Sequence, residues 1–218
     1  MQYPKKLAVA LTAGTLLFTL AACGGDGDTA DAGAGAGADQ TATNGDVFND
    51  ADVDFATSMI PHHAQALAMV DLTRGRELSP PVQALTEDIQ AAQGPEIETM
   101  VDWLTGWDQP VPETMRDHVN AEDPDGMGGH DTEDMEGETE SDMPGMMTGA
   151  ELANLDAAQG MEFEDMWLEM MIEHHEGAIE MAKDEQAEGV FQAAVDLAES
   201  IETSQQAEID LMQGLLAS

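Results

Sequence analysis

The sequence predicts an all-α fold, a four-helix bundle made of two repeated helical hairpins that a long disordered linker joins. The first observation is a repeat, because the pattern Met-Ile-x-His-His-x-x-Ala-x-x-Met occurs at residues 59–69 and again 112 residues later, at residues 171–181. The second is that the same offset, without a gap, aligns the stretch after each copy, so each repeat spans two helices and their turn. The third is a composition rich in methionine and alanine but only 4% aromatic, which suits helix packing.

The N-terminal segment predicts export and lipid anchoring. Two lysines precede an apolar stretch, residues 8–20, that is too short for a comfortable membrane span. Leu-Ala-Ala-Cys at residues 20–23 matches a lipobox. We therefore expect residues 1–22 to be a lipoprotein signal peptide and Cys23 to carry a lipid that anchors the chain in the cell membrane, facing outside the cytoplasm. The alternative is an ordinary signal peptide with a chance cysteine. Cys23 is the only cysteine, which excludes a disulfide or a thiolate metal site within the exported domain.

The rest of the chain divides into a tether and one domain. Residues 23–47 are mostly Gly, Ala, Asp and Thr, so we expect a flexible tether, followed by a folded domain at residues 48–218. Residues 106–147 are rich in proline, glycine and acidic side chains, and we expect a disordered linker between the hairpins. Methionines and histidines scattered in this linker are typical of tracts that capture copper loosely, and an inert spacer is the alternative.

The first hairpin covers about residues 48–105. Its first helix is expected to start near Asn49 or Asp50, which are both plausible N-caps, and to contain Pro61 beside the histidines. Its second helix is expected to start at Ser79, where a serine precedes two prolines.

The second hairpin covers about residues 148–217. Thr148 followed by Glu151 predicts a capping box at the start of one long helix. Gly189 marks the turn, and the last helix runs to the C-terminus.

Each copy of the repeated pattern places two imidazoles and at least one thioether within reach of one small ion, because side chains three and four residues apart are helix neighbours. This combination suits Cu(I), Ag(I) or Cu(II) better than Ca²⁺ or Mg²⁺. The candidate metal ligands are Met59, His62, His63, Met69, Met171, His174, His175 and Met181. Zinc bound by histidine alone is the competitor, but it leaves the methionines unexplained. Methionines that only pack the core and histidines that only form buried hydrogen bonds are the remaining alternatives.

A further group of residues is expected to support the ligands from the second helix of each hairpin. The group consists of Gln93, Glu96, Met100, Gln205, Glu208 and Met212. Its glutamines interrupt otherwise apolar stripes and need partners, and an imidazole N–H is a natural one that would orient a metal-binding ring. Its methionines are further ligands or plain core.

The formal net charge of −39 excludes nucleic acid as a partner and argues against docking on anionic lipid headgroups. It favours the accumulation of cations near the surface. No Glu-x-x-His pair of the di-iron type includes any of the four repeated histidines, and the chain has no Gly-x-Ser-x-Gly elbow and no phosphate loop. We therefore predict binding without enzymatic turnover.

The repeated pattern, with Ile-x-x-x-Gln-x-x-Glu-Ile-x-x-Met-x-x-x-Leu after each copy, resembles the domain of unknown function 305 (DUF305) family, which includes CopM-like exported copper-binding proteins. The resemblance covers about residues 48–105 and 150–217. It implies a ferritin-like four-helix bundle that binds copper, with silver as a second candidate, outside the cytoplasm. The copies differ in Pro61 against Glu173 and, in the two residues directly after the His-His pair, in Ala-Gln against Glu-Gly, which implies unequal affinities.

These observations predict a lipid-anchored protein that binds copper for sequestration, tolerance or delivery. The expected partners are a metal ion, the membrane through Cys23, and a copper-handling protein. Two rivals stay open: a non-metal helical interaction module at the cell surface, and a ferritin-like metal-dependent oxidoreductase. Whether the two histidine pairs share one ion or hold one each also stays open.

Overall fold

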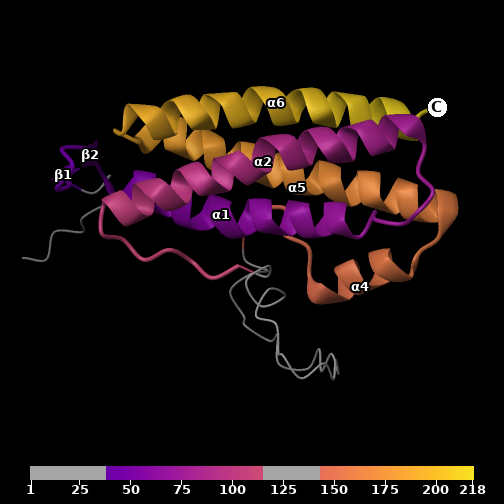
Figure 1. Cartoon of the computed structure of the whole chain (residues 1–218). Helices are drawn as coiled ribbons and strands as arrows, with labels where there is room; N and C mark the ends of the chain where they lie inside the picture. Colours follow the sequence, from indigo (N-terminus) through magenta and orange to yellow (C-terminus); the bar gives the residue numbers. More distant parts are fainter. Residues whose placement is uncertain (1–37, 115–142) are drawn as a thin grey trace, which may run out of the picture. The chain divides into compact units, whose positions relative to one another are not determined.

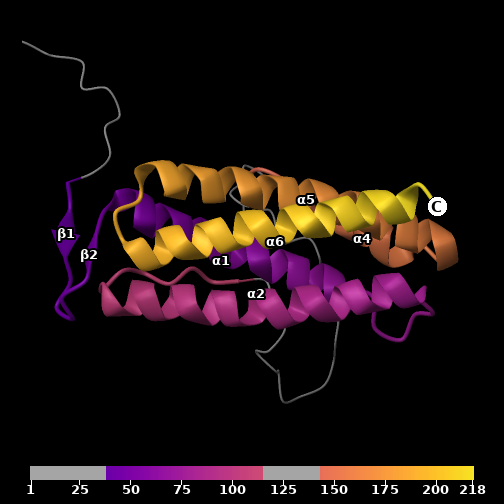
Figure 2. The same ribbon diagram turned by 90° about the horizontal axis from the view of Figure 1, so that it is seen from above.

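The computed structural model describes residues 38–114 and 143–218, and within them four long helices lie side by side (Figure 1). The helices are α1 (Asp50–Asp71), α2 (Pro80–Gly106), α5 (Gly160–Glu188) and α6 (Gln192–Leu216), with a short α4 (Gly149–Ala157) beside α5. α1 pairs with α2 and α5 with α6, and α1 also packs along α5, so that the two hairpins form one bundle (Figure 2). The predicted all-α fold is confirmed.

Capping bonds are present at two of the predicted helix starts. The Asn49 side chain accepts from the Asp52 N–H at 3.1 Å, and the Asp52 carboxylate accepts from the Asn49 N–H at 2.7 Å, which closes a capping box on α1. Thr148 and Glu151 form the same box on α4. Ser79 precedes α2 as expected, although its side chain makes no capping bond to its own helix.

On the first helix of each hairpin, one carboxylate holds the start of the second helix of the other hairpin. Asp52 on α1 accepts from the main-chain N–H groups of Val190 at 3.1 Å and Phe191 at 3.0 Å, where α6 begins. Glu164 on α5 accepts from the N–H of Ser79 at 2.9 Å and from its hydroxyl at 2.6 Å, where α2 begins. Asp52 and Glu164 are 112 residues apart, as are Ser79 and Phe191. The sequence repeat is therefore an approximate two-fold in the structure.

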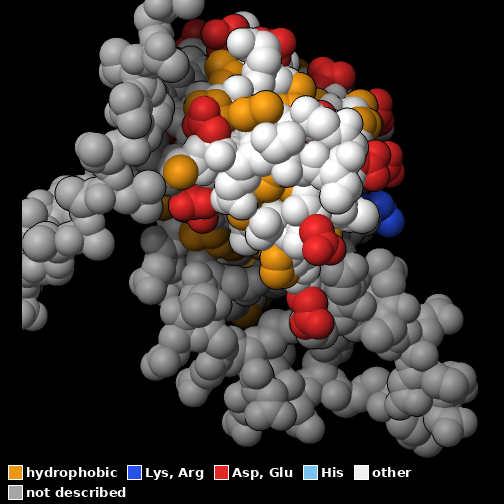
Figure 3. Space-filling view, turned by 90° about the vertical axis from the view of Figure 1, so that its left-hand side faces the viewer, with side chains coloured by type: hydrophobic (Ala, Val, Ile, Leu, Met, Phe, Trp, Pro, Cys, Tyr) orange, Lys and Arg blue, Asp and Glu red, His pale blue; other side chains and the backbone are white. Residues whose placement is uncertain are grey.

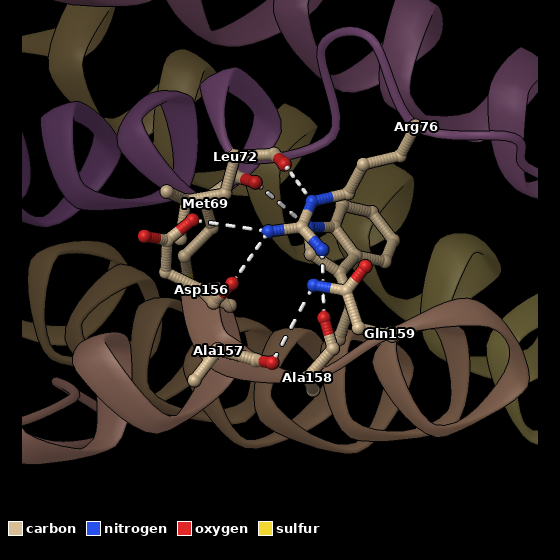
Figure 4. Close-up of polar contacts among 8 residues, drawn as sticks. Met69, Leu72, Arg76, Asp156, Ala157, Ala158 and Gln159 are labelled. Carbon is tan, nitrogen blue, oxygen red and sulfur yellow. Dashed lines mark hydrogen bonds and ion pairs between the residues drawn. The ribbon is translucent and has the colours of Figure 1, made fainter.

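The single long helix expected after Thr148 is wrong, because the chain forms α4 and α5 with a break between them. Ala158 and Gln159 are extended, with ψ near 155° and 147°, and Gly160 has a φ of 59°. Arg76, from the loop between α1 and α2, donates to the main-chain oxygens of Ala158 and Asp156 at 2.7 Å each (Figure 4). A helix continuing through these residues would use both oxygens itself, so Arg76 stabilises the break.

The structure describes the chain from residue 38, and the prediction of a flexible tether is wrong from there on. β1 (Gln40–Thr41) and β2 (Val47–Phe48) form a small antiparallel hairpin. The Phe48 ring stacks on that of Trp107 at 4.6 Å, and the Trp107 indole donates to Asp46 at 3.2 Å, which ties the hairpin to the end of α2. On this end of the bundle, acidic side chains are spread among apolar and uncharged groups (Figure 3). The predicted signal peptide and Cys23 lie outside the described residues.

Most of the predicted linker, residues 115–142, also lies outside the described residues. Residues 143–147 do not fit the prediction of a disordered linker, because they pack against α1 and α5 through hydrogen bonds and close main-chain contacts. None of the described helices is long and apolar enough to cross a membrane.

Candidate metal centre

A layer of polar side chains divides the apolar core of the bundle into two clusters. The first cluster includes Met69, Ile89, Trp167, Met171 and Met212. The second includes Phe55, Met59, Met100, Leu104 and Ile201. Each long helix contributes to both clusters and carries polar residues where it passes from one to the other. These residues, which we call the histidine layer, are His62, His63, Gln93, Glu96, His174, His175, Gln205 and Glu208.

The internal two-fold passes through the histidine layer. Met59 belongs to the second cluster and Met171, 112 residues later, to the first. Ile89 belongs to the first cluster and Ile201, at the same offset, to the second. Equivalent residues of the two hairpins therefore lie in opposite clusters, so the two-fold axis passes between the clusters. This brings the two His-His pairs together in the bundle interior.

The four histidine rings form one buried group. All four side chains are 0% exposed. The His62 and His174 rings are in direct contact, with centroids 3.8 Å apart and planes tilted by 40°, and the His174 and His175 centroids are 6.4 Å apart. The pairs therefore face each other inside the bundle instead of facing solvent on opposite sides.

Three of the rings are held through the same nitrogen. The Nε2 atom of His63 lies 2.8 Å from Glu96 Oε2, that of His175 lies 2.6 Å from Glu208 Oε2, and that of His62 lies 3.0 Å from the Pro144 main-chain oxygen. A carboxylate or a carbonyl oxygen accepts only, so each Nε2 donates a proton. A neutral imidazole that donates from Nε2 carries its lone pair on Nδ1.

The Nδ1 atoms are open, by which we mean that none of the four has a hydrogen-bond partner among the described residues. His174 differs from the other three, because its Nε2 also lacks a partner within residues 38–114 and 143–218. Buried polar atoms in proteins are nearly always paired, so four open imidazole nitrogens in one layer make this layer the candidate site.

The two rings in contact are neutral at physiological pH. Burial, with smaller contributions from the neighbouring His63 and His175, lowers the pKa of His62 to about 3, against the opposing effect of the Pro144 carbonyl. Burial also lowers the pKa of His174 well below its usual 6.5, with smaller contributions from His62, His175 and His63, although the nearby His62 main chain opposes this shift in part. Neutral imidazoles are the form that binds metal ions.

The methionines predicted as ligands occupy three different settings. Met59 and Met171 are fully buried, three residues before His62 and His174 on the same helices. Met69 is buried within the first cluster. Met181 is half-buried and lines a pocket beside Phe55, Ser58 and Glu185. Met100 and Met212 are fully buried core residues.

The residues expected to support the rings lie in two settings. Glu96 and Glu208 contact an imidazole, at equivalent positions of the two hairpins. The expected bond from a glutamine to an imidazole is not formed, because both polar side-chain atoms of Gln93 and the Oε1 of Gln205 lack partners among the described residues. In the described ranges no group of three or more His, Cys, Asp or Glu side chains has the geometry to hold a metal ion. The layer thus offers donors without a finished coordination shell.

Sequence reasoning missed the contribution of residues 143–147. The Pro144 carbonyl contacts His62, and the Gln65 side chain exchanges two hydrogen bonds with the main chain of Met147. Gln65 is equivalent by the repeat to Gly177, so this difference between the copies was the available signal.

Comparison with known proteins agrees with this architecture. Residues 52–216 match the family described as domain of unknown function, DUF305. A DUF305 protein from Streptomyces coelicolor has a TM-score of 0.61 and 32% identity over 77% of this chain and 91% of its own. A DUF305 fragment from Deinococcus radiodurans has a TM-score of 0.61 and 28% identity over 82% of this chain and 99% of its own.

CopM in its Cu(II)-bound form is also similar, with a TM-score of 0.57 and 26% identity over 76% of this chain and 95% of its own. No curated protein matches the chain. The family match extends over most of the sequence and includes both hairpins and the histidine layer. The chain therefore belongs to the DUF305 family.

Proposed function

We propose that the protein binds copper in the histidine layer and sequesters or delivers it without turnover. One observation carries the proposal: four fully buried imidazoles meet in one layer, and each has an open Nδ1. A buried acceptor without a partner costs stability, on the order of 1–3 kcal/mol. A bound ion would satisfy these nitrogens.

The chemistry of the donors favours a soft ion. Imidazole nitrogens with nearby thioethers suit Cu(I), Cu(II) or Ag(I), whereas Ca²⁺ and Mg²⁺ prefer oxygen. Met59 and Met171 are buried at the two borders of the layer, on the same helices as the histidines, and are the methionines best placed to complete a site. The similar CopM has been solved with Cu(II) and with Cu(I) bound, which supports copper as the metal.

The two glutamates would tune the rings. Glu96 and Glu208 are largely buried, at 16% and 18% side-chain exposure, and each holds an imidazole by Nε2. A carboxylate behind a metal-binding histidine fixes the orientation of the ring and makes the other nitrogen a better donor. We therefore assign His63 and His175 as equivalent ligands through Nδ1.

The proposed setting is the outer side of the cell membrane. It rests on the lipobox that ends at Cys23 and on the acidic composition, which concentrates cations. Membrane fractionation of cells that express the chain or its Cys23→Ser variant tests the anchor, since the variant should leave the membrane fraction.

The metal proposal is tested by competition with a chromogenic Cu(I) chelator. Replacing His62, His63, His174 and His175 together by alanine should abolish tight binding while circular dichroism still reports a helical protein. His118→Ala/His130→Ala is the matched control, because it removes the two histidines outside the layer. An unchanged affinity in the fourfold variant would contradict the proposal and favour a non-metal module.

A further inference from the structure

Residues 143–147, which we call the strap, lie across α1 and α5 beside the histidine layer. The Gln65 side chain on α1 anchors the strap: its Nε2 donates to the Met147 carbonyl at 2.9 Å, and its Oε1 accepts from the Met147 N–H at 2.7 Å. Met146 and Met147 are only 8% and 5% exposed. The strap is thus built into the folded domain at a defined register.

The contact between the strap and α5 depends on two glycines. Gly145 has a φ of 74°, a backbone conformation that favours glycine, and a Cβ atom there would collide with the main-chain oxygen of Glu173. A Cβ atom on Gly177 would collide with the Pro144 main chain. The strap and α5 therefore meet backbone to backbone, and no side chain larger than hydrogen fits at either glycine.

The strap also contacts a histidine of the layer. The Pro144 carbonyl accepts from His62 Nε2 at 3.0 Å. Among the described residues, the strap is the one non-helical segment that forms a hydrogen bond to a ring of the layer, since the bonds to His63 and His175 come from α2 and α6. His62 is thereby held with its lone pair on Nδ1.

Because all four rings are 0% exposed, an ion reaches them only if part of the protein moves. The long helices are held by two large apolar clusters. The strap is held by two hydrogen bonds to one side chain, one hydrogen bond to a ring, its glycine contacts, and the buried side chains of Met146 and Met147, of which Met147 packs in the first cluster. Segments with few buried apolar contacts open at lower free energy than core helices.

We propose that the strap is the gate of the histidine layer, with Gln65 as its anchor and Gly177 as its seat. Docked, it seals the layer and holds His62 for metal binding. Released, it opens the path by which a copper ion enters and leaves. This proposal rests on the proposed function, because a gate needs an ion to pass.

The test compares Gly177→Ala and Gln65→Leu with the parent and with Gly214→Ala. Gly214 is a matched control, since it lies in α6 and a Cβ atom there would meet no described atom within 4 Å. Alanine is a better helix former than glycine, so Gly177→Ala does not weaken α5 itself. The measurement is stopped-flow transfer of Cu(I) from the loaded protein to an excess of chelator.

We expect both strap variants to release Cu(I) at least tenfold faster than the parent, and Gly214→Ala to release it at the parent rate. Release within twofold of the parent in both strap variants, with helicity intact, would overturn the gate and leave copper binding untouched. A parent that binds no Cu(I) would overturn both proposals. Hydrogen exchange of the Met147 N–H in the metal-free protein supplies an independent readout. It should be protected in the parent and exposed in Gln65→Leu, and equal protection in the two would contradict the anchor.

Discussion

The two halves of the molecule hold their second histidine alike and their first histidine differently. His63 and His175 each donate to an equivalent glutamate, at 2.8 and 2.6 Å. His62 donates to the strap, whereas His174 has no hydrogen-bond partner among the described residues. The comparison teaches that the histidines and their glutamates obey the internal two-fold, whereas the strap, which forms a hydrogen bond to His62 alone among the four histidines, does not.

The largest expected effect tests the symmetric part of the comparison. His63→Ala and His175→Ala should each weaken Cu(I) affinity about 100-fold, because each removes a proposed ligand, and loss of an outer partner alone costs about 10- to 100-fold. Chelator competition measures both affinities. Since the rings are equivalent, the two losses should agree, and a difference greater than about tenfold would show that the halves do not contribute equally.

Much of this architecture follows from local signals in the sequence. The repeat places His62 and His174 at equivalent positions, and any two-fold pairing of the hairpins brings equivalent interior residues together at the axis. The capping box at Thr148 is equally local, since it needs only a threonine and a glutamate three residues apart. Glu96 was also predictable as a partner from local spacing, because it shares a helix face with the core positions around it.

The remaining features depend on tertiary contacts that no local pattern records. Residues 158–159 are not poor helix formers, and the break before α5 is stabilised by Arg76 from a distant loop. The strap has the composition of the linker that precedes it, so its docking follows only from the Gln65 anchor and from the space that Gly177 leaves. Composition predicts disorder correctly only where no such partner exists in the fold.

A second difference between the halves concerns pH. Burial, with a smaller contribution from the neighbouring Asp52 side chain, raises the pKa of Glu185 from 4.5 to about 8. The equivalent position in the first half holds Thr73, whose hydroxyl donates to a main-chain oxygen at 2.6 Å. Between about pH 4.5 and 8 the folded chain retains a proton that the unfolded chain has lost. Stability should therefore fall as the pH rises through this window and become flat above it.

Glu185→Gln should remove this decline, because glutamine cannot ionise and has nearly the same volume as a protonated glutamic acid. Between pH 5 and 8 we expect the free energy of unfolding to fall by on the order of 2 kcal/mol more in the parent than in the variant. This is less than the pKa shift alone would give, because solvent screens part of the charge. Urea unfolding at several pH values measures the difference, and Thr73→Val is a control that leaves the slope unchanged. Parallel pH profiles for the parent and Glu185→Gln would contradict a buried, protonated Glu185.

The smallest expected effect separates a metal ligand from a structural histidine. His174→Leu replaces a buried ring whose two nitrogens both lack partners in the described part of the chain. It should stabilise the metal-free protein by about 1 kcal/mol, because the cost of the unpaired nitrogens disappears and the apolar volume is kept. His62→Leu should stabilise the metal-free protein by about 1 kcal/mol less than His174→Leu does, because it also breaks the bond to the Pro144 carbonyl. Thermal unfolding of the metal-free proteins measures both changes.

Both variants should bind Cu(I) more weakly, so His174→Leu would gain stability and lose affinity together. A histidine retained only for packing would instead lose stability on this replacement, and such a loss would count against the metal centre at the position where the two halves differ most.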